Sequence, residues 1–147
     1  MCKFWIIVLL ALIAGSSRAQ KYQLFSPDQK LVIEVEISPS IQVKLLKNNT
    51  EMLKLSGLSL QFEGNIPDFG KLQVKKVTHK SVNEQVKPLI KEKADLYTNQ
   101  YNEMQVAFKS GVAISFRLFN EGLAYRFSTL VKDSLTVLSE NLKIQLA

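Results

Sequence analysis

Two carboxylates spaced two residues apart, Glu34 and Glu36, are the first candidates for acid–base chemistry in this sequence. Hydrolysis of a glycosidic bond, for example, needs two carboxyl groups that flank the bond at a separation of about 5–10 Å. Because residues i and i+2 of a strand share one face, these two side chains lie next to each other and cannot flank a substrate. The spacing therefore predicts a solvated strand face. Four other acidic residues fall in or beside the middle of the chain without a spacing that selects a pair: Glu84, Glu92, Asp95 and Glu103.

Residue types that bind metals or act as nucleophiles are scarce. His79 is the only histidine and Cys2 the only cysteine, which excludes a zinc site. The sequence has no calcium loop of the Asp-x-Asp-x-Asp-Gly type and no serine in a Gly-x-Ser-x-Gly elbow. We therefore assign no catalytic residue and no metal ligand, leave substrate-binding residues unassigned, and expect His79 to be solvated.

The first 19 residues follow the order of a secretory signal peptide. An uncharged apolar run from Phe4 to Ala14 comes after Lys3, and Ser17-Arg18-Ala19 offers small residues for cleavage after Ala19. The apolar run is too short to span a membrane, which takes about 20 residues. We therefore expect export to the periplasm or the exterior of a bacterium, with no stable membrane span after cleavage.

Charge and length narrow the classes of protein further. Cleavage would remove Lys3 and Arg18, which lowers the formal net charge of +6 to +4. The remaining basic residues are dispersed rather than grouped with aromatic ones, so nucleic-acid binding is not expected. No cysteine remains, which excludes a disulfide framework. The length of 147 residues fits one domain over residues 20–147 and excludes a (β/α)₈ barrel within this chain, because that fold needs about 250 residues.

Apolar and polar residues alternate along most of the remaining sequence. Every second residue from Leu31 to Ile37 is apolar, for example, which is the period of a strand with one buried face. Turn residues recur roughly every 8–12 positions without a convincing amphipathic helix, and this predicts an all-β antiparallel sandwich or barrel. The segments with this pattern are Leu31–Ile37, Ile41–Leu45, Met52–Leu55, Leu58–Phe62, Leu72–Val77, Met104–Phe108, Val112–Leu118, Leu123–Leu130, Leu135–Leu138 and Leu142–Leu146.

The regions between and after these segments carry their own expectations. Asn48 and Asn49 tolerate the left-handed conformation that tight hairpins require. Lys80–Gln100 is interpreted as short strand pieces and loop, with a possible helix over Lys91–Leu96. The sequence stops inside a strand pattern at Asn141–Ala147, so we expect the sandwich to be incomplete at its C-terminal end and the chain to be the N-terminal part of a longer protein.

One hairpin carries a resemblance to a known family. Ile114–Phe127 resembles the Arg-x-x-Asn-[Asp/Glu]-Gly-[Val/Leu]-Ala-[Phe/Tyr]-Arg-[Tyr/Phe] motif of glycoside hydrolase family 97. Ser26–Leu31 resembles that family's opening strand, and Leu55–Leu60 resembles its Ser-x-Leu-Gly-Leu segment with the glycine displaced. Further pieces resemble its Ser-Val-x-Glu-x-Trp-Lys-Pro and Tyr-Asn-Glu stretch and a later glutamate: Ser81–Glu84, Lys87-Pro88, Tyr101–Glu103 and Leu138–Glu140.

The resemblance implies the N-terminal β-super-sandwich of an exported bacterial α-glycosidase, chiefly an α-glucosidase or α-galactosidase. In that family the sandwich accompanies a catalytic (β/α)₈ barrel that hydrolyses α-linked oligosaccharides, and its catalytic acids and calcium ligands match no position of residues 1–147. The resemblance therefore implies an accessory domain that is inactive alone, with the barrel as its partner, no cofactor in this segment and calcium only in the full-length enzyme. The alternative is a stand-alone carbohydrate-binding or adhesion sandwich without catalysis.

The hairpin also has a physical interpretation of its own. Asn120-Glu121-Gly122 forms the turn, with Gly122 expected at positive φ, which costs glycine least. The planar guanidinium groups of Arg117 and Arg126 can hold carboxylates or backbone carbonyls. Two interpretations stay open: solvated arginines on a hairpin that only stabilises the fold, or arginines that brace the sandwich against the barrel. Four aromatic residues of the hairpin are expected in the core: Phe116, Phe119, Tyr125 and Phe127.

Overall fold

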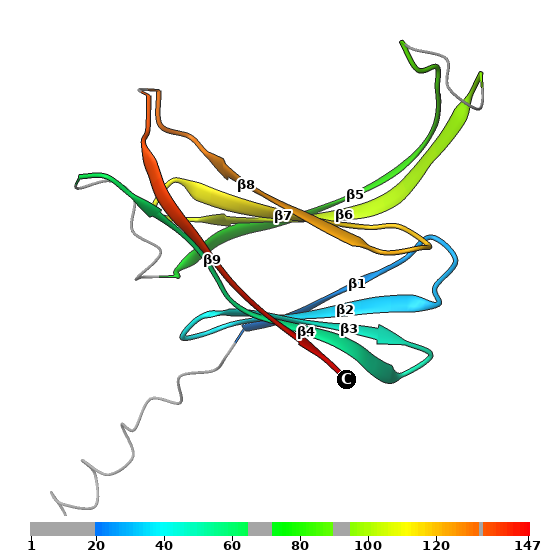
Figure 1. Cartoon of the computed structure of the whole chain (residues 1–147), viewed down its shortest axis with the longest axis horizontal. Helices are drawn as coiled ribbons and strands as arrows, with labels where there is room; N and C mark the ends of the chain where they lie inside the picture. Colours follow the sequence, from blue (N-terminus) through cyan, green and yellow to red (C-terminus); the bar gives the residue numbers. More distant parts are fainter. Residues whose placement is uncertain (1–19, 65–71, 90–94, 133) are drawn as a thin grey trace, which may run out of the picture.

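The computed structural model describes residues 20–64, 72–89, 95–132 and 134–147, and their regular secondary structure is entirely β-strand. Two antiparallel sheets face each other (Figure 1): sheet A has the strand order β1-β2-β3-β4-β9 and sheet B the order β5-β6-β7-β8. The predicted all-β antiparallel sandwich is thereby confirmed. The strands are β1 (Gln20–Phe25), β2 (Leu31–Ile37), β3 (Ile41–Lys47), β4 (Thr50–Phe62), β5 (Val74–Val86), β6 (Tyr97–Phe108), β7 (Val112–Leu118), β8 (Leu123–Thr129) and β9 (Val137–Leu146).

The core lies between the sheets and is made by the alternation seen in the sequence. On β2, Ile33 and Val35 are fully buried, whereas Glu34 between them is exposed. On the facing sheet, Ile114 and Phe116 of β7 are likewise fully buried. Burial of each such side chain contributes about 1.5–3 kcal/mol. The inner faces of the two sheets are therefore formed by the period-2 patterns that were predicted from the sequence.

Two turns test the backbone conformations predicted from the sequence, and one of the two predictions is confirmed. Asn48 and Asn49 adopt φ values of 49° and 64° between β3 and β4, which confirms the predicted left-handed turn. Gly122 does not adopt positive φ, so that prediction is wrong. The Phe119 N–H donates a hydrogen bond to the Gly122 C=O at 2.9 Å. The side chain of Asn120 accepts a hydrogen bond from Asp28 in the turn between β1 and β2, so a tertiary contact accompanies this turn in place of a left-handed residue.

The middle of the chain is more regular than predicted. Instead of short strand pieces, β5 and β6 form one long hairpin that rises from sheet B as an arm (Figure 1). Polar cross-strand bonds support the arm, such as the one from Asn99 Nδ2 to Glu84 Oε1 at 2.7 Å. In the outer part of this arm, Lys80–Val86 and Tyr97–Gln100, no side chain is fully buried on either face, so the sequence shows no apolar alternation there. The possible helix over Lys91–Leu96 falls largely outside the described residues.

Three further differences concern strand limits. β1 was not predicted, because only Tyr22 and Leu24 alternate as apolar residues over its length. The two pieces predicted on either side of Gly57 are one strand, β4, in which Gly57 has a φ of 68° at an irregularity of the pairing with β9. The two pieces predicted after Leu135 are likewise one strand, β9.

The predicted signal peptide, residues 1–19, lies outside the described residues, so its cleavage stays a prediction. Among the residues that are described, no helix has the length and apolar character needed to cross a membrane.

Candidate functional site

The two hairpin arginines lie on the outer face of sheet B, the face turned away from sheet A. Arg117 on β7 stands opposite Glu103 on β6, and its Nε donates a hydrogen bond to Glu103 Oε2 at 2.5 Å. Its Cζ lies 4.7 Å from the centroid of the Tyr101 ring. Tyr101 packs in turn on Phe119, with ring centroids 5.1 Å apart. We call these four side chains the Arg117 cluster.

The ion pair of the Arg117 cluster is partly shielded from water. The Glu103 side chain is 18% exposed and the Arg117 side chain 40%. The hydrogen bond to Glu103 raises the pKa of Arg117, against a smaller opposing effect of burial. The stacked guanidinium also covers Tyr101, which is only 5% exposed. The cluster therefore stabilises sheet B from within, and Glu103 is held by Arg117 rather than available as a free acid.

Asn120 connects the hairpin to the other sheet. Its Oδ1 accepts the backbone N–H of Asp28 at 3.0 Å, and Asp28 lies in the turn between β1 and β2. Hydrogen bonds, the largest from Ser26, lower the pKa of Asp28. A second tie runs from Asn102 Nδ2 to the Phe25 carbonyl at 2.8 Å. These bonds join sheet B, at the β7–β8 turn and at β6, to the β1–β2 end of sheet A.

Arg126 has different surroundings from Arg117. It is exposed on β8, and within the part of the chain that the structure describes no ion pair engages it. Together with Ser115 and Ala124 it lines a shallow hollow of about 200 Å³ that also reaches Arg117. Glu121 is exposed at the tip of the turn. The structure thus brings both arginines to one face but leaves only the Arg126 guanidinium available to a new partner.

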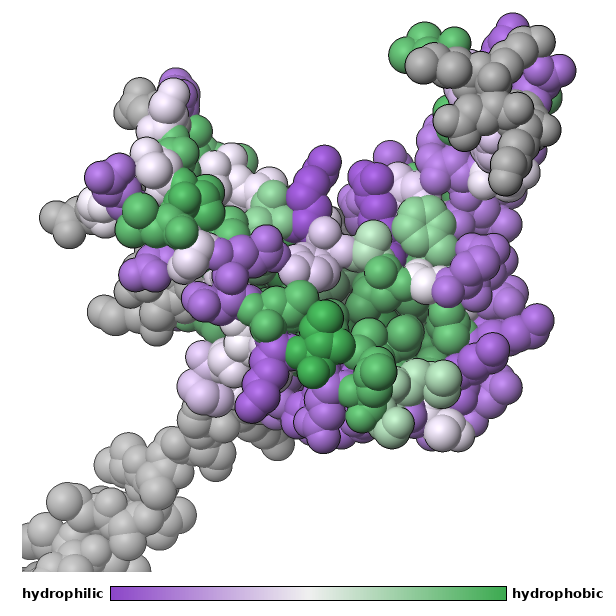
Figure 2. All heavy atoms as spheres, in the orientation of Figure 1, coloured by the Kyte–Doolittle hydropathy of each residue, from purple (hydrophilic) through white to green (hydrophobic). Residues whose placement is uncertain are grey.

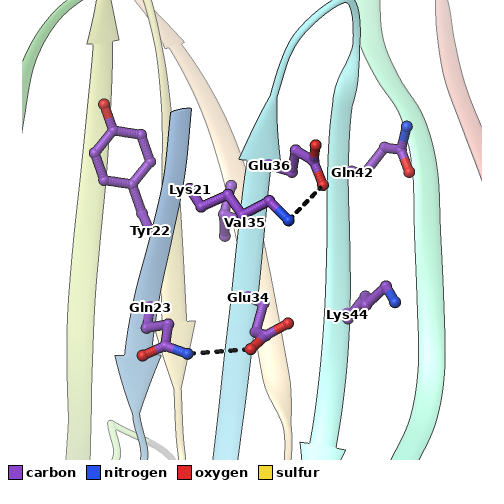
Figure 3. Close-up of a pocket in the computed structure, with 8 residues that line it drawn as sticks. All are labelled: Lys21, Tyr22, Gln23, Glu34, Val35, Glu36, Gln42 and Lys44. Atoms are coloured by element: carbon purple, nitrogen blue, oxygen red, sulfur yellow. Dashed lines mark hydrogen bonds and ion pairs between the residues drawn. The ribbon is translucent and has the colours of Figure 1, made fainter. Parts of the chain in front are cut away.

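The outer face of sheet A carries the first candidate acids. Glu36 forms an ion pair with Lys21 at 3.8 Å, and Gln23 Nε2 donates to Glu34 Oε1 at 3.1 Å (Figure 3). These side chains border a hollow of about 380 Å³ with Lys44 and other polar neighbours. The two glutamates lie side by side on β2 and do not face each other across this hollow (Figure 3). The prediction of a solvated strand face is confirmed.

The remaining candidates give no metal site among the described residues. His79 lies exposed on β5, as expected. Across residues 20–64, 72–89, 95–132 and 134–147, no group of three or more His, Cys, Asp or Glu side chains could hold a metal ion. The absence of a cofactor in this segment and the presence of calcium in a full-length enzyme both stay predictions.

The four aromatic residues of the hairpin divide between the two faces of sheet B. Phe116 is fully buried in the core, and Tyr125 and Phe127 pack against that core while partly exposed. Phe119 is not a core residue, because it follows the end of β7 and packs on Tyr101 at the outer face. The prediction for Phe119 is therefore wrong.

Tyr125 yields a test of the contact between the sheets. Its hydroxyl donates to Glu140 Oε1 on β9 at 2.6 Å. Burial first, and then this bond, raise the pKa of Tyr125 to about 12 from 10.0. Because the neutral phenol is favoured in the folded state, its contribution is complete below pH 10 and is lost as pH rises from 10 to 12. We expect Tyr125→Phe to lower the free energy of unfolding at pH 7 by about 1 kcal/mol.

The pH profile of Tyr125→Phe distinguishes ionisation from a simple loss of packing. Between pH 10 and 12 the difference in unfolding free energy between the parent and Tyr125→Phe should shrink, since only the parent loses this bond. Urea unfolding at several pH values measures it. A difference that stays constant up to pH 12 would contradict the assigned role of the hydroxyl.

Comparisons with known proteins agree with this geometry. The family profile described as glycosyl-hydrolase 97 N-terminal matches residues 24–147. A retaining alpha-galactosidase from Bacteroides thetaiotaomicron is 28% identical over 141 residues, which cover 95% of this chain and 21% of that protein. A glycoside hydrolase family 97 enzyme from Pseudoalteromonas sp. strain K8, solved with acarbose, superposes with a TM-score of 0.67 at 18% identity. That match covers 81% of this chain and 19% of the enzyme, and a variant of the same enzyme gives 0.68. The chain thus spans about a fifth of the length of these relatives.

Proposed function

The chain belongs to the glycosyl-hydrolase 97 N-terminal family, and on this premise we propose that it is the non-catalytic support domain of an exported α-glycosidase. Its partner is the catalytic domain of such an enzyme, which hydrolyses α-linked oligosaccharides. The observation that carries the proposal is the match of nearly the whole chain to a family described as N-terminal and to only 21% of a retaining alpha-galactosidase. The sandwich supplies a docking face, and the bond-breaking groups come from the remaining four-fifths.

The outer face of sheet B is the part of the sandwich best suited to docking. It forms the floor of a broad hollow between the β5–β6 arm and the connection from β8 to β9 (Figure 2). Arg117 is held by Glu103, whereas Arg126 keeps an exposed guanidinium that can take a carboxylate or a backbone carbonyl of the partner. This division supports the bracing interpretation for Arg126 alone.

The experiment is a chimera with the relative. The full chain replaces the matched 141-residue segment of the retaining alpha-galactosidase, and hydrolysis of an aryl α-galactoside is measured for the chimera, the full chain alone and the relative with that segment deleted. We expect turnover by the chimera, none by the full chain, and at least a tenfold loss in the deleted relative. Turnover by the full chain alone would refute a support role.

The alternative of a stand-alone sugar-binding sandwich makes a different prediction in the same experiment. Sugar-binding surfaces usually present aromatic rings, but on the candidate face Tyr101 is covered by Arg117 and Phe119. A lectin would bind α-galactosides as the isolated full chain and would not restore the deleted relative. Calorimetry with the same aryl α-galactoside distinguishes the two functions.

A further inference from the structure

The predicted leader cleavage gives the mature chain a reactive first residue. Cleavage after Ala19 leaves Gln20 at the N-terminus, so a free α-amino group and a carboxamide belong to the same residue. When this amine attacks the carboxamide carbon of a glutamine, a five-membered lactam ring closes. An asparagine at the same place would need a strained four-membered ring. Residue 20 therefore has the side chain that N-terminal cyclisation requires.

The structure leaves Gln20 accessible for such a reaction. Gln20 begins β1, which lies at one edge of sheet A, and its side chain is exposed. It pairs with Ile37 at the end of β2 and borders a shallow hollow of about 330 Å³. A ring made from the atoms of Gln20 therefore has room and displaces no core side chain.

The charges around Gln20 favour a neutral N-terminus. Lys109 lines the same hollow, and none of the described residues that line it is acidic. The closest carboxylate along β2 is that of Glu36, which already forms an ion pair with Lys21 at 3.8 Å (Figure 3). An ammonium group on Gln20 would thus share the hollow with a like charge and with no carboxylate. Cyclisation removes this charge, because a lactam nitrogen is neutral.

The Tyr22 hydroxyl suits both the open and the closed form of Gln20. It donates a hydrogen bond to Gln20 Oε1 at 3.2 Å. Negative charge develops on this oxygen when an amine adds to the carboxamide carbon, and a donor directed at it stabilises that charge. The lactam keeps Oε1 as its carbonyl oxygen, so the acceptor of Tyr22 survives the reaction.

We propose that Gln20 is a modification site, at which the mature chain is closed as N-terminal pyroglutamate. The α-amino nitrogen of Gln20 attacks Cδ, the bond between these two atoms forms, and the bond from Cδ to Nε2 breaks. A proton from the amine passes to Nε2, which leaves as ammonia. The reaction needs no oxidant, reductant or other co-reactant. This inference goes beyond the proposed function and rests only on the export named there.

A closed N-terminus would protect a strand on which the fold depends. Aminopeptidases need a free α-amino group, so pyroglutamate blocks the stepwise removal of β1. Leu24 on this strand is a core residue that is only 5% exposed. The turn after β1 carries Asp28, whose backbone N–H binds Asn120 of the hairpin in sheet B. Loss of β1 would therefore open the core and remove a contact between the sheets.

The test is the intact mass and the N-terminal sequence of the full chain, expressed with its leader in the organism of origin and purified after export. We expect the mass of residues 20–147 less one ammonia, and no reading from Edman sequencing. Digestion of the unfolded protein with pyroglutamyl aminopeptidase should then give a sequence that starts at Lys21. This digestion identifies the lactam directly, because the enzyme removes no other N-terminal residue.

Two variants locate the modification. Gln20→Asn keeps a carboxamide but not the ring size, so it should show the full mass and a readable N-terminal sequence. Gln23→Asn changes a glutamine of the same strand whose nitrogen lies within the chain, so it should keep the loss of ammonia. Both side chains are exposed, so both variants should keep the parent melting temperature within about 2 °C. A general aminopeptidase should shorten Gln20→Asn and leave the parent and Gln23→Asn intact.

The outcomes separate this inference from the proposed function. A chain that is cut after Ala19 but keeps its full mass would overturn the modification and leave export and the support role intact. Cleavage at another bond, or a loss of ammonia that persists in Gln20→Asn, would likewise refute the site. A chain that retains its leader would overturn export together with the modification. Pyroglutamate at Gln20 beside an inactive chimera would refute the support role alone.

Discussion

Phe116→Ala should lower the free energy of unfolding by about 3–5 kcal/mol, the range for removing a large buried aromatic side chain. Phe116 is fully buried near the centre of β7, and Ile114 and Leu118 on the same face are fully buried as well. Its ring fills space between the sheets that neighbouring side chains cannot reach without moving the strands. Because a domain of this size is stable by only about 5–15 kcal/mol, the variant would lose a large fraction of its stability.

Urea unfolding followed by circular dichroism measures the effect of Phe116→Ala, with an unchanged slope against urea as the sign that the unfolded state is the same. Phe25→Ala is the matched control, because Phe25 is 47% exposed at the end of β1. We expect a change below about 1 kcal/mol for this control. Equal losses in the two variants would show that β7 is not the centre of the core.

The sequence predicted best where one face of a strand is buried. Ile33 and Ile114 lie in runs whose period follows directly from burial, so the strand and its inward face were both readable. The outer part of the β5–β6 arm was missed because none of its side chains is fully buried on either face. The strands there are held by backbone pairing, which leaves no hydrophobic pattern in the sequence. β1 was missed for a similar reason, because only Tyr22 and Leu24 alternate as apolar residues along it.

The pairing of Glu103 with Arg117 could have been predicted from the sequence. Lys109-Ser110-Gly111 was predicted as the turn between two strands, and residues equally distant from Ser110 face each other in a tight hairpin. Glu103 and Arg117 are each seven positions from Ser110, and they are paired in the structure. The contact of Asn120 with Asp28 had no such signal, because it joins residues far apart in sequence through the packing of two sheets.

Arg117→Met and Arg126→Met should separate the two roles that the sequence left open for the arginines. Arg117→Met removes the partner of Glu103, whose side chain is only 18% exposed, and should lower the free energy of unfolding of the full chain by about 1–2 kcal/mol. Arg126 is exposed, so Arg126→Met should change stability by less than about 0.5 kcal/mol. Methionine keeps much of the aliphatic length in both variants, so loss of the guanidinium is the main change in each.

The chimera then gives the complementary measurement. If Arg126 holds a carboxylate or carbonyl of the catalytic domain, Arg126→Met should reduce aryl α-galactoside hydrolysis by about tenfold, equivalent to about 1.4 kcal/mol in activation free energy. A double-mutant cycle of Arg117→Met with Glu103→Gln should give a coupling of about 1 kcal/mol in the full chain, while Arg126→Met should be additive with Glu103→Gln. Unchanged hydrolysis with Arg126→Met would leave Arg126 a solvated residue of the outer face. The docking of sheet B would then have to depend on other contacts, because Arg117 is already committed to its own sheet.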